Sequence, residues 1–236
     1  MKVCAIGDIH GTNKFLDCYM DIKKNDDDCE KIIVLGDHFD PYDNISLDEM
    51  AEKYSEFIDI CKNDERVVSI LGNHDLSRYI IYDNITNRTE RSFTNIERIR
   101  NMILPNLKDS YLTYKIGNYL FSHAGVSKNW IDDISELGYD KMIFENKRGW
   151  DEKELSDIVS YSPSDYSGYG DCVRQGCTWI RPYALNKSAV DGYNQVVGHT
   201  QVTDIAKIEM LNGMELWLID NQRKSKYLTL EIEESE

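Results

Sequence analysis

Five short segments of the sequence combine glycine with aspartate, asparagine or histidine, and each follows an apolar run typical of a β-strand. They are GDIHG (7–11), GDHFD (36–40), GNHD (72–75), SHAG (122–125) and GHT (198–200). Glycine lets the backbone turn sharply beside each polar residue and approach a bound group closely. The side chains in these segments that could bind a metal ion are Asp8, His10, Asp37, Asn73, His123 and His199.

These six side chains offer oxygen and imidazole nitrogen and no thiolate, which is the donor set of hard or borderline divalent cations. Asp8 and His10 are two positions apart, so both point to the same side if the preceding strand continues. Six donors exceed the needs of one catalytic ion, and the carboxylates are too few for a calcium cage. We therefore expect two ions that share a bridging aspartate. The two ions would acidify a bridging water for in-line attack on a phosphoryl group.

The elements expected to position the first three segments alternate along the chain. Strand-like runs at 3–6, 32–35 and 67–71 are separated by helical periodicity at 13–24 and 47–61. This order predicts a parallel sheet. Loops at the carboxyl ends of parallel strands converge on one crevice, so residues far apart in sequence would face the same point.

The later part of the chain has a different pattern. Further strand-like runs lie at 119–121 and 196–197, and hairpin turns are expected at Gly117-Asn118 and Asn212-Gly213. A last strand is expected at 227–232. The second half is therefore predicted to be mostly antiparallel.

The composition describes a globular protein, because 41% of the 236 residues are apolar. We expect one domain over residues 1–236, with an irregular insertion at 147–176 that is rich in Asp, Ser, Gly and Tyr. A net charge of −15, from 42 acids and 27 bases, argues against general nucleic-acid binding and against a membrane-surface partner.

A cytoplasmic location is expected, since no secretory signal and no bilayer-length apolar run is visible. Six scattered cysteines are then expected to be free thiols.

The ordered set GDIHG, GDxxD, GNHD, SHAG and GHT resembles the calcineurin-like metallophosphoesterases. Within them it is similar to the phosphoprotein-phosphatase-type branch, which holds serine/threonine phosphatases and dinucleoside tetraphosphatase-like enzymes. The resemblance covers residues 1–220. It implies an α/β fold, a four-layer α/β/β/α sandwich with two mixed sheets and a dimetal site at the carboxyl ends of the strands. Manganese is the first expectation for the two divalent ions, with iron, zinc, nickel or cobalt as alternatives.

The family pattern implies a role for each of the six candidate ligands. Asp37 would bridge the two ions and so take part in both coordination spheres. The others would divide between the ions, with Asp8 and His10 on the first, and Asn73, His123 and His199 on the second.

The resemblance also implies residues that act on the substrate. His74 would be the general acid that protonates the leaving oxygen, and Asp40 would orient its imidazole. Arg181, in the segment CTWIRPY, resembles a phosphate-binding arginine of the family. Asn73 would contact the substrate as well as a metal ion.

Two departures from the family pattern bear on the substrate. Pro41 stands where an arginine usually follows the second aspartate of GDxxD, and proline cannot bind phosphate. The closing motif GHTQ also lacks the second histidine of the wider superfamily. His38, the one histidine that is not assigned a role, is expected to be a surface or outer residue that points away from the ions.

The predicted function is hydrolysis of phosphomonoesters, including phosphoserine or phosphothreonine, by a metal-bridging hydroxide. Pro41 keeps a second enzyme class open, the hydrolysis of phosphoanhydrides or diesters such as dinucleoside polyphosphates or nucleic-acid terminal phosphates. A non-catalytic metal-binding scaffold is the third alternative, and it has no need of His74. The expected partner is a phosphorylated small molecule, a nucleotide or a phosphoprotein.

Overall fold

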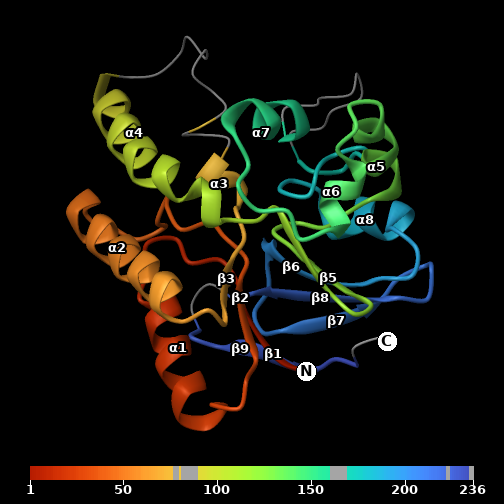
Figure 1. Cartoon of the computed structure of the whole chain (residues 1–236), viewed down its shortest axis with the longest axis horizontal. Coiled ribbons are helices and arrows are strands. Elements are labelled where there is room, and N and C mark those ends of the chain that lie inside the picture. Colours follow the sequence, from red (N-terminus) through yellow and green to blue (C-terminus); the bar gives the residue numbers. More distant parts are fainter. Residues whose placement is uncertain (77–79, 81–89, 160–168, 222–223, 234–236) are drawn as a thin grey trace.

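A computed structural model gives the structure of the protein and describes residues 1–76, 80, 90–159, 169–221 and 224–233. Two β-sheets lie at the centre, and helices cover their outer faces (Figure 1). None of the helices in these ranges has both the length and the apolar character that a membrane span requires.

The first sheet has the strand order β3-β2-β1-β9. Its first three strands are parallel, as predicted, and β9 is antiparallel to β1. The helices α1 and α2 connect the parallel strands. The bounds are β1 Lys2–Ile6, α1 Lys14–Asn25, β2 Lys31–Val34, α2 Leu47–Asn63, β3 Val67–Ser69 and β9 Tyr227–Glu231.

The second sheet has the strand order β4-β5-β6-β8-β7. Both predicted hairpins are confirmed, because β4 pairs antiparallel with β5 and β7 with β8, and each turn holds a glycine with positive φ. The pairs β5·β6 and β6·β8 are parallel, which was not predicted, although three of the five described pairs formed by β4 to β9 are antiparallel as expected. The bounds are β4 Thr113–Ile116, β5 Tyr119–Ser122, β6 Asn194–Gln201, β7 Ala206–Glu209 and β8 Glu215–Asp220.

The physical reason lies in the connections between these strands. A long helical crossover returns the chain from β5 to β6 in the same direction, and β8 inserts beside β6 rather than at the sheet edge. β6 is also longer than the two residues predicted. Its register against β8 shifts between Val197 and Gln201, so His199 lies in an irregular part of the strand and not in a loop after it.

Helices in the middle of the chain were not predicted from the sequence. Helix α7 lies within the segment 147–176 that was expected to be irregular, and residues 160–168 of that segment are outside the described residues. The bounds are α3 Asn73–Leu76, α4 Glu90–Ile103, a 3-10 helix η2 Leu104–Asp109, α5 Lys128–Ser135, α6 Asp140–Phe144, α7 Glu152–Val159 and α8 Pro182–Ser188.

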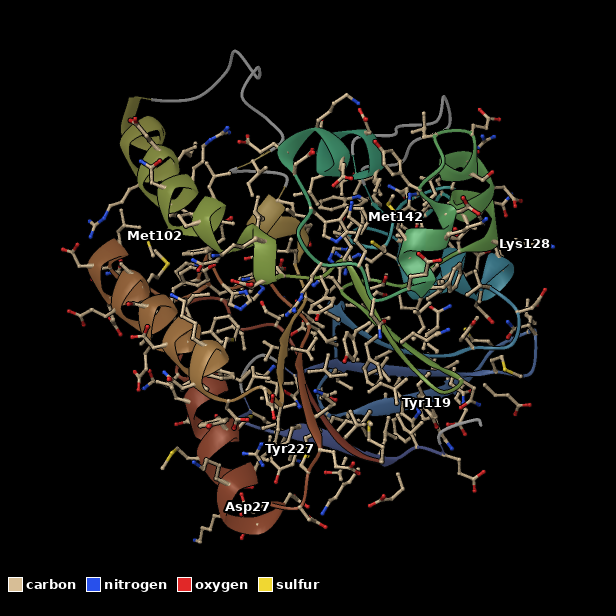
Figure 2. All side chains as sticks on the ribbon, viewed as in Figure 1. Asp27, Met102, Tyr119, Lys128, Met142 and Tyr227 are labelled. Atoms are coloured by element: carbon tan, nitrogen blue, oxygen red, sulfur yellow. The ribbon has the colours of Figure 1, made fainter. Side chains whose placement is uncertain are left out.

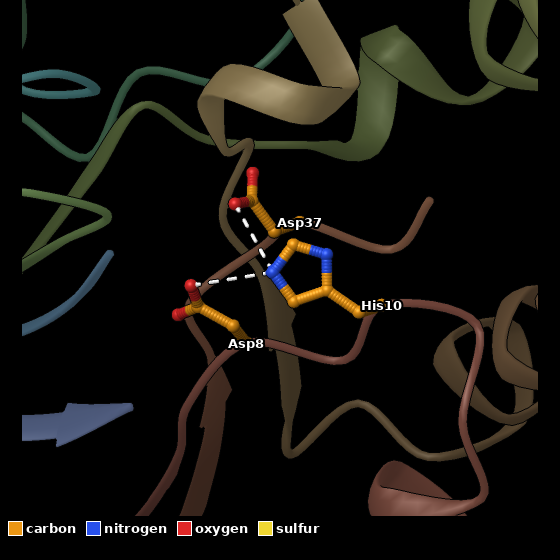
Figure 3. A group of neighbouring side chains, drawn as sticks. All are labelled: Asp8, His10 and Asp37. Carbon is orange, nitrogen blue, oxygen red and sulfur yellow. Dashed lines mark ion pairs between the residues drawn. The ribbon is translucent and has the colours of Figure 1, made fainter. Parts of the chain in front are cut away.

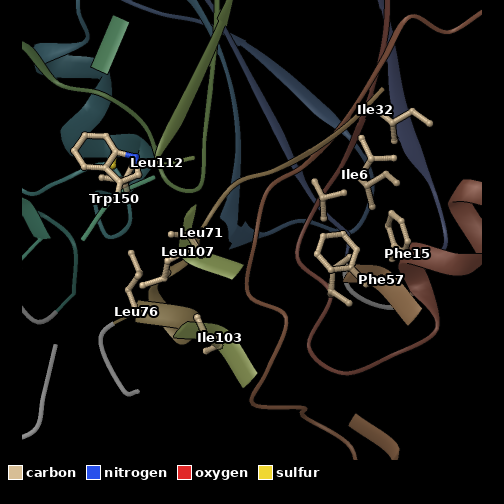
Figure 4. Packing of buried hydrophobic residues seen from close by; sticks show 14 of the residues in the cluster. Ile6, Phe15, Ile32, Phe57, Leu71, Leu76, Ile103, Leu107, Leu112 and Trp150 are labelled. Carbon is tan, nitrogen blue, oxygen red and sulfur yellow. The ribbon is translucent and has the colours of Figure 1, made fainter. Parts of the chain in front are cut away.

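Alternating side chains of the strands form the packed layers. Ile6 of β1 packs with Phe15 of α1 and Phe57 of α2 (Figure 4), while Val3 and Ala5 face the second sheet. Side chains fill the space between the two sheets (Figure 2). On the far face of the second sheet, α8 packs against β6 and β8. The layers confirm the predicted four-layer α/β/β/α sandwich with two mixed sheets.

The six cysteines are all free, as predicted, and five of them are buried. Helix α2 begins with a capping hydrogen bond in which Glu49 N donates to Ser46 Oγ at 3.2 Å, and α5 begins in the same way at Ser127. These caps fix the points at which the chain leaves the site loops and enters the helices.

Candidate metal centre

The five glycine-bearing segments come together at the carboxyl ends of the strands, where the two sheets meet. Direct hydrogen bonds join the segments across the sheets. His199 N donates to Asp8 Oδ1 at 3.0 Å, and His123 Nδ1 lies 2.7 Å from the carbonyl oxygen of Leu35. Residues up to 191 positions apart in sequence are therefore held in one buried site.

Asp8, His10 and Asp37 form the tightest group (Figure 3). All three are buried, and their candidate ligand atoms lie within 4.8 Å of one another. His10 Nε2 is 3.8 Å from Asp8 Oδ2 and 3.6 Å from Asp37 Oδ2. These separations are too long for hydrogen bonds and leave room for an ion between the atoms.

The tautomer of His10 follows from its other ring nitrogen. His10 Nδ1 lies 3.0 Å from the carbonyl oxygens of both Phe39 and Asp40, so it carries the proton and donates. The buried Nε2 then faces the two carboxylates with no hydrogen-bond partner among the described residues, and it would offer its lone pair to a cation that takes the place of its proton. A divalent cation fits this set of donors, because carboxylates and a neutral imidazole oriented by a carbonyl are common metal ligands.

A second group forms on the other side of Asp37. His123 Nε2 is 3.4 Å from Asp37 Oδ2 and 2.8 Å from Asn73 Oδ1. The His199 ring lies 5.1 Å from the His123 ring, and its Nε2 is 3.2 Å from the carbonyl oxygen of Trp179. If that nitrogen donates, Nδ1 of His199 is left as the ligand atom. Asp37 therefore stands between two groups of donors.

The backbone of the site is strained in a consistent way. Four of the five non-glycine residues with positive φ in the described chain are motif residues, at φ values of +47° to +59°. Such a backbone costs on the order of 1–3 kcal/mol per residue and persists only where the surroundings enforce it. The four residues are His10, Asp37, Asp40 and His199.

Two glycines make room for the carboxylates. A Cβ at Gly72 would lie 2.1 Å from Asp37 Oδ1, and a Cβ at Gly198 would lie 2.0 Å from Asp8 Oδ1. Any other residue at these positions would displace a candidate ligand. Gly72 and Gly198 thus make room for a carboxylate from a neighbouring loop, not for a residue of their own loop.

Asp75 is a residue of the site that sequence reasoning missed. Its buried carboxylate accepts hydrogen bonds at 2.8 Å from the backbone N–H groups of Asp37, His38 and Gly72. Burial raises its pKa, but His38 and these donors outweigh burial and hold the pKa below its usual value. Asp75 therefore locks the second motif loop to the third. The only sequence signal was a carboxylate directly after Asn73-His74.

His38 is buried and does not lie at the surface. Its ring packs 4.4 Å from the Phe57 ring, and its Nδ1 is 3.4 Å from Asp75 Oδ2. The surface alternative was therefore wrong. The other alternative, an outer residue that points away from the ions, agrees with these contacts.

His74 and Asp40 form a close pair beside the first group. His74 Nδ1 is 2.7 Å from Asp40 Oδ2, and His74 N donates to Asp37 Oδ1 at 2.8 Å. Burial disfavours the charged imidazole, but Asp40 and Asp37 outweigh burial and raise the pKa of His74. The His74 ring contacts the His10 ring with centroids 5.3 Å apart.

The electrostatics of the site reflect buried charges that face one another. Burial and repulsion from Asp8 raise the pKa of Asp37 well above its usual value. Burial disfavours the charged form of His10, but Asp8 and Asp37 raise its pKa to about 9. Burial, His123 and Arg181 lower the pKa of His199. Two buried carboxylates beside each other are unfavourable unless cations offset them.

Arg181 lies next to the second group of donors. Its Nη1 donates to the carbonyl oxygen of His199 at 2.7 Å and to Thr200 Oγ1 at 3.2 Å. No carboxylate pairs with it within the described ranges. Arg174, by contrast, forms an ion pair with the buried Asp133.

The fold and the motif residues define a phosphoesterase. Residues 1–203 match the calcineurin-like phosphoesterase family, and the chain therefore belongs to that family. It is a metal-dependent phosphoric ester hydrolase.

Solved structures with a similar arrangement include a protein serine/threonine phosphatase from Saccharomyces cerevisiae with similarity to human phosphatase PP5. It is 16% identical, with a TM-score of 0.48 over 92% of this chain and 67% of the other. A metallophosphoesterase from Sphaerobacter thermophilus is also 16% identical, with a TM-score of 0.45 over 92% and 75% of the two chains. The purple acid phosphatase PPD1 from yellow lupin seeds is 14% identical, with a TM-score of 0.41 over 94% and 44%.

No curated protein matches the chain in sequence. Because all three structural similarities have TM-scores below 0.5, family membership rests on the sequence match.

Proposed function

We propose that the protein hydrolyses phosphomonoesters with two divalent ions held at the meeting point of the two sheets. The observation that carries the proposal is the buried Nε2 of His10, which faces the carboxylates of Asp8 and Asp37 without a hydrogen-bond partner among the described residues. The His74–Asp40 pair next to it supplies a group that can donate a proton.

The ligand sets follow the two groups of donors. Asp8 and His10 would hold the first ion, and Asp37 would belong to both sets. Manganese is our first choice, with iron, zinc, nickel or cobalt also suited to nitrogen and oxygen donors. Asn73, His123 and His199 would hold the second ion.

When bound, the two ions supply an acidified water as the nucleophile and offset charge on the phosphoryl oxygens. The residues of the chain then have separate tasks. His74, oriented through Nδ1 by Asp40, gives a proton from Nε2 to the leaving oxygen as the P–O bond breaks. Arg181 and the amide of Asn73 hold the phosphoryl oxygens, and a planar guanidinium suits a dianionic monoester.

A second candidate function is the hydrolysis of phosphodiesters or phosphoanhydrides. Pro41 favours it, because an arginine at this position would have recognised the second charge of a monoester. A metal-binding scaffold without catalysis is less favoured, since the hydrogen bond between His74 and Asp40 would serve no purpose in it.

The test compares phenyl phosphate with diphenyl phosphate as substrates of the same preparation. We expect faster turnover of the monoester, loss of activity on chelation and recovery with manganese. Arg181→Ala should lower kcat/KM for the monoester. The fall should correspond to a loss of about 2–4 kcal/mol of transition-state stabilisation. The diester should lose less, because it carries one charge fewer.

Faster diester turnover that Arg181→Ala leaves unchanged would support the second candidate instead. No turnover of either ester by metal-loaded protein would support the scaffold. Metal content of the variant, measured beside activity, separates lost phosphate binding from lost metal.

A further inference from the structure

An exposed tyrosine stands on the rim of the candidate metal centre. Tyr42 follows Pro41 and lies two residues after Asp40, and 63% of its surface is exposed. Its ring packs edge-to-face on the imidazole of His10, with centroids 4.6 Å apart and an angle of 64° between the planes. A large aromatic side chain is thus in direct contact with a proposed metal ligand.

Packing in the hydrophobic core does not account for this placement. Tyr42 is absent from the three hydrophobic clusters of the described chain, and its hydroxyl forms no hydrogen bond with the described residues. The neighbouring residues Pro41 and Asp43 are also at least partly exposed. An exposed ring held at one edge against His10 leaves other parts of its surface open to a ligand.

The geometry of the reaction gives that surface a use. The leaving oxygen must come within hydrogen-bond reach of His74, and the rings of His74 and Tyr42 both contact the ring of His10. If the ions held the phosphoryl group, the leaving group would lie beside His74, and the exposed ring of Tyr42 shares with His74 the contact to His10. The aromatic surface that the leaving group can meet on the rim beside His10 is Tyr42.

We infer that Tyr42 is a specificity-determining residue that stacks on a planar aromatic ring in the leaving group of the substrate. The inference rests on the proposed function and names its substrate class: phosphate esters of phenols or of nucleosides. Pro41 thus removes one contact to phosphate from this segment, and Tyr42, the next residue, adds a contact to the leaving group.

The test measures binding and turnover separately. Binding is measured by calorimetry for phenylphosphonate and methylphosphonate, which are not hydrolysed, with the manganese-loaded protein. Turnover is measured with phenyl phosphate, adenosine 5′-monophosphate and glycerol 2-phosphate. The variants are Tyr42→Phe, Tyr42→Leu and, as a control with a similarly exposed apolar side chain distant from the motif loops, Leu211→Ala, whose native side chain is 79% exposed.

We expect wild-type protein to bind phenylphosphonate more tightly than methylphosphonate. Tyr42→Leu should raise the Kd of phenylphosphonate about 3- to 10-fold, the usual strength of an aromatic pair, and leave that of methylphosphonate unchanged. KM for an aromatic ester should rise by the same factor with kcat retained. Tyr42→Phe and Leu211→Ala should both resemble wild type. A rise for phenyl phosphate alone assigns the ring to a phenol, and a rise for adenosine monophosphate assigns it to a nucleoside.

Equal binding of the two phosphonates by wild-type protein would overturn the inference. So would a parallel loss for aromatic and aliphatic ligands in Tyr42→Leu at unchanged metal content, since that pattern means that Tyr42 only supports His10. Absent turnover of all three esters with the phosphonate preference intact would overturn the proposed function and leave the binding role of Tyr42 standing.

Discussion

The two halves of the candidate metal centre are built in different ways. In the half formed by the first sheet, His10 and Asp37 lie on tight loops with left-handed backbone, and Asp75 ties two of these loops together. In the half formed by the second sheet, His123 directly follows β5 and His199 lies in the irregular part of β6. One half depends on loop–loop hydrogen bonds and the other on strands.

The second half is also oriented by the first. The carbonyl oxygen of Leu35 accepts from His123 Nδ1, and the carboxylate of Asp8 accepts from His199 N. Damage to the first half should therefore spread to the second, whereas damage to the second half should stay local. The next three experiments test this difference.

Asp37→Asn should have the largest effect, because Asp37 stands between both groups of donors. We expect loss of both ions and a fall in kcat of ~10³-fold or more, since metal ions supply several kcal/mol of charge stabilisation. Metal analysis by mass spectrometry on the desalted variant measures the first effect. His199→Asn is the matched variant of the second half and should lose one ion only. Two ions retained in Asp37→Asn would contradict the bridging role.

His74→Asn tests a residue of the first half that is not a proposed ligand. Proton donation by a positioned imidazole contributes ~10²–10⁴-fold, so kcat for phenyl phosphate should fall by that factor with metal content retained. The loss should shrink for 4-nitrophenyl phosphate, because its leaving group needs less protonation. Asp40→Asn should show the same trend at smaller size. An equal loss for both esters would assign His74 to another task.

Asp75→Asn should have the smallest effect of the three variants on kcat of the metal-loaded protein. The amide keeps one acceptor oxygen but places an NH₂ group among the three backbone donors that Asp75 now satisfies. We expect metal affinity to fall about 10- to 100-fold, the usual effect of losing a group that orients ligands. Asp133→Asn is the control, since Asp133 is a buried carboxylate paired with Arg174. Asp133→Asn should lower the melting temperature without changing metal affinity.

The elements of the fold that depend on local sequence were largely predictable. Apolar runs that end in glycine marked β1 and β2, and three- and four-residue periodicity marked α1 and α2 to within two residues at each end. The two hairpin turns were visible because glycine at positive φ leaves a local signal. In each case the information lies within about twenty residues of sequence.

The strand pairing of the second sheet was less predictable because it depends on contacts between residues far apart in sequence. β5 pairs with β6 although Tyr119 and its partner Asn194 are separated by several helices, and no local pattern reports that pairing. The helices α4 to α8 are short or amphipathic, and packing rather than composition decides them.

In the candidate site, too, local sequence motifs were predictable and contacts between distant segments were not. The sequence order of the motifs was enough to name the six candidate ligands, and the structure brings all six to one place. Asp75 was missed because its three donors meet it only after two loops have folded against each other. The role of Arg181 as a phosphate ligand stays a prediction, although its contacts with His199 and Thr200 place it beside the second group.

The pairing of β1 with β9 has a consequence for the order of folding. A contact between Cys4 and Thr229 spans 225 positions, so the strand that leads into Asp8 and His10 is paired on one side by a segment that is synthesised much later. Chains with such remote pairings fold slowly, because a long loop must close before the contact stabilises it. During translation Asp8 and His10 leave the ribosome well before β9, yet the sheet that carries them is complete only after the chain has emerged to β9. Stable metal binding at the centre should therefore wait until β9 has been synthesised and has paired with β1.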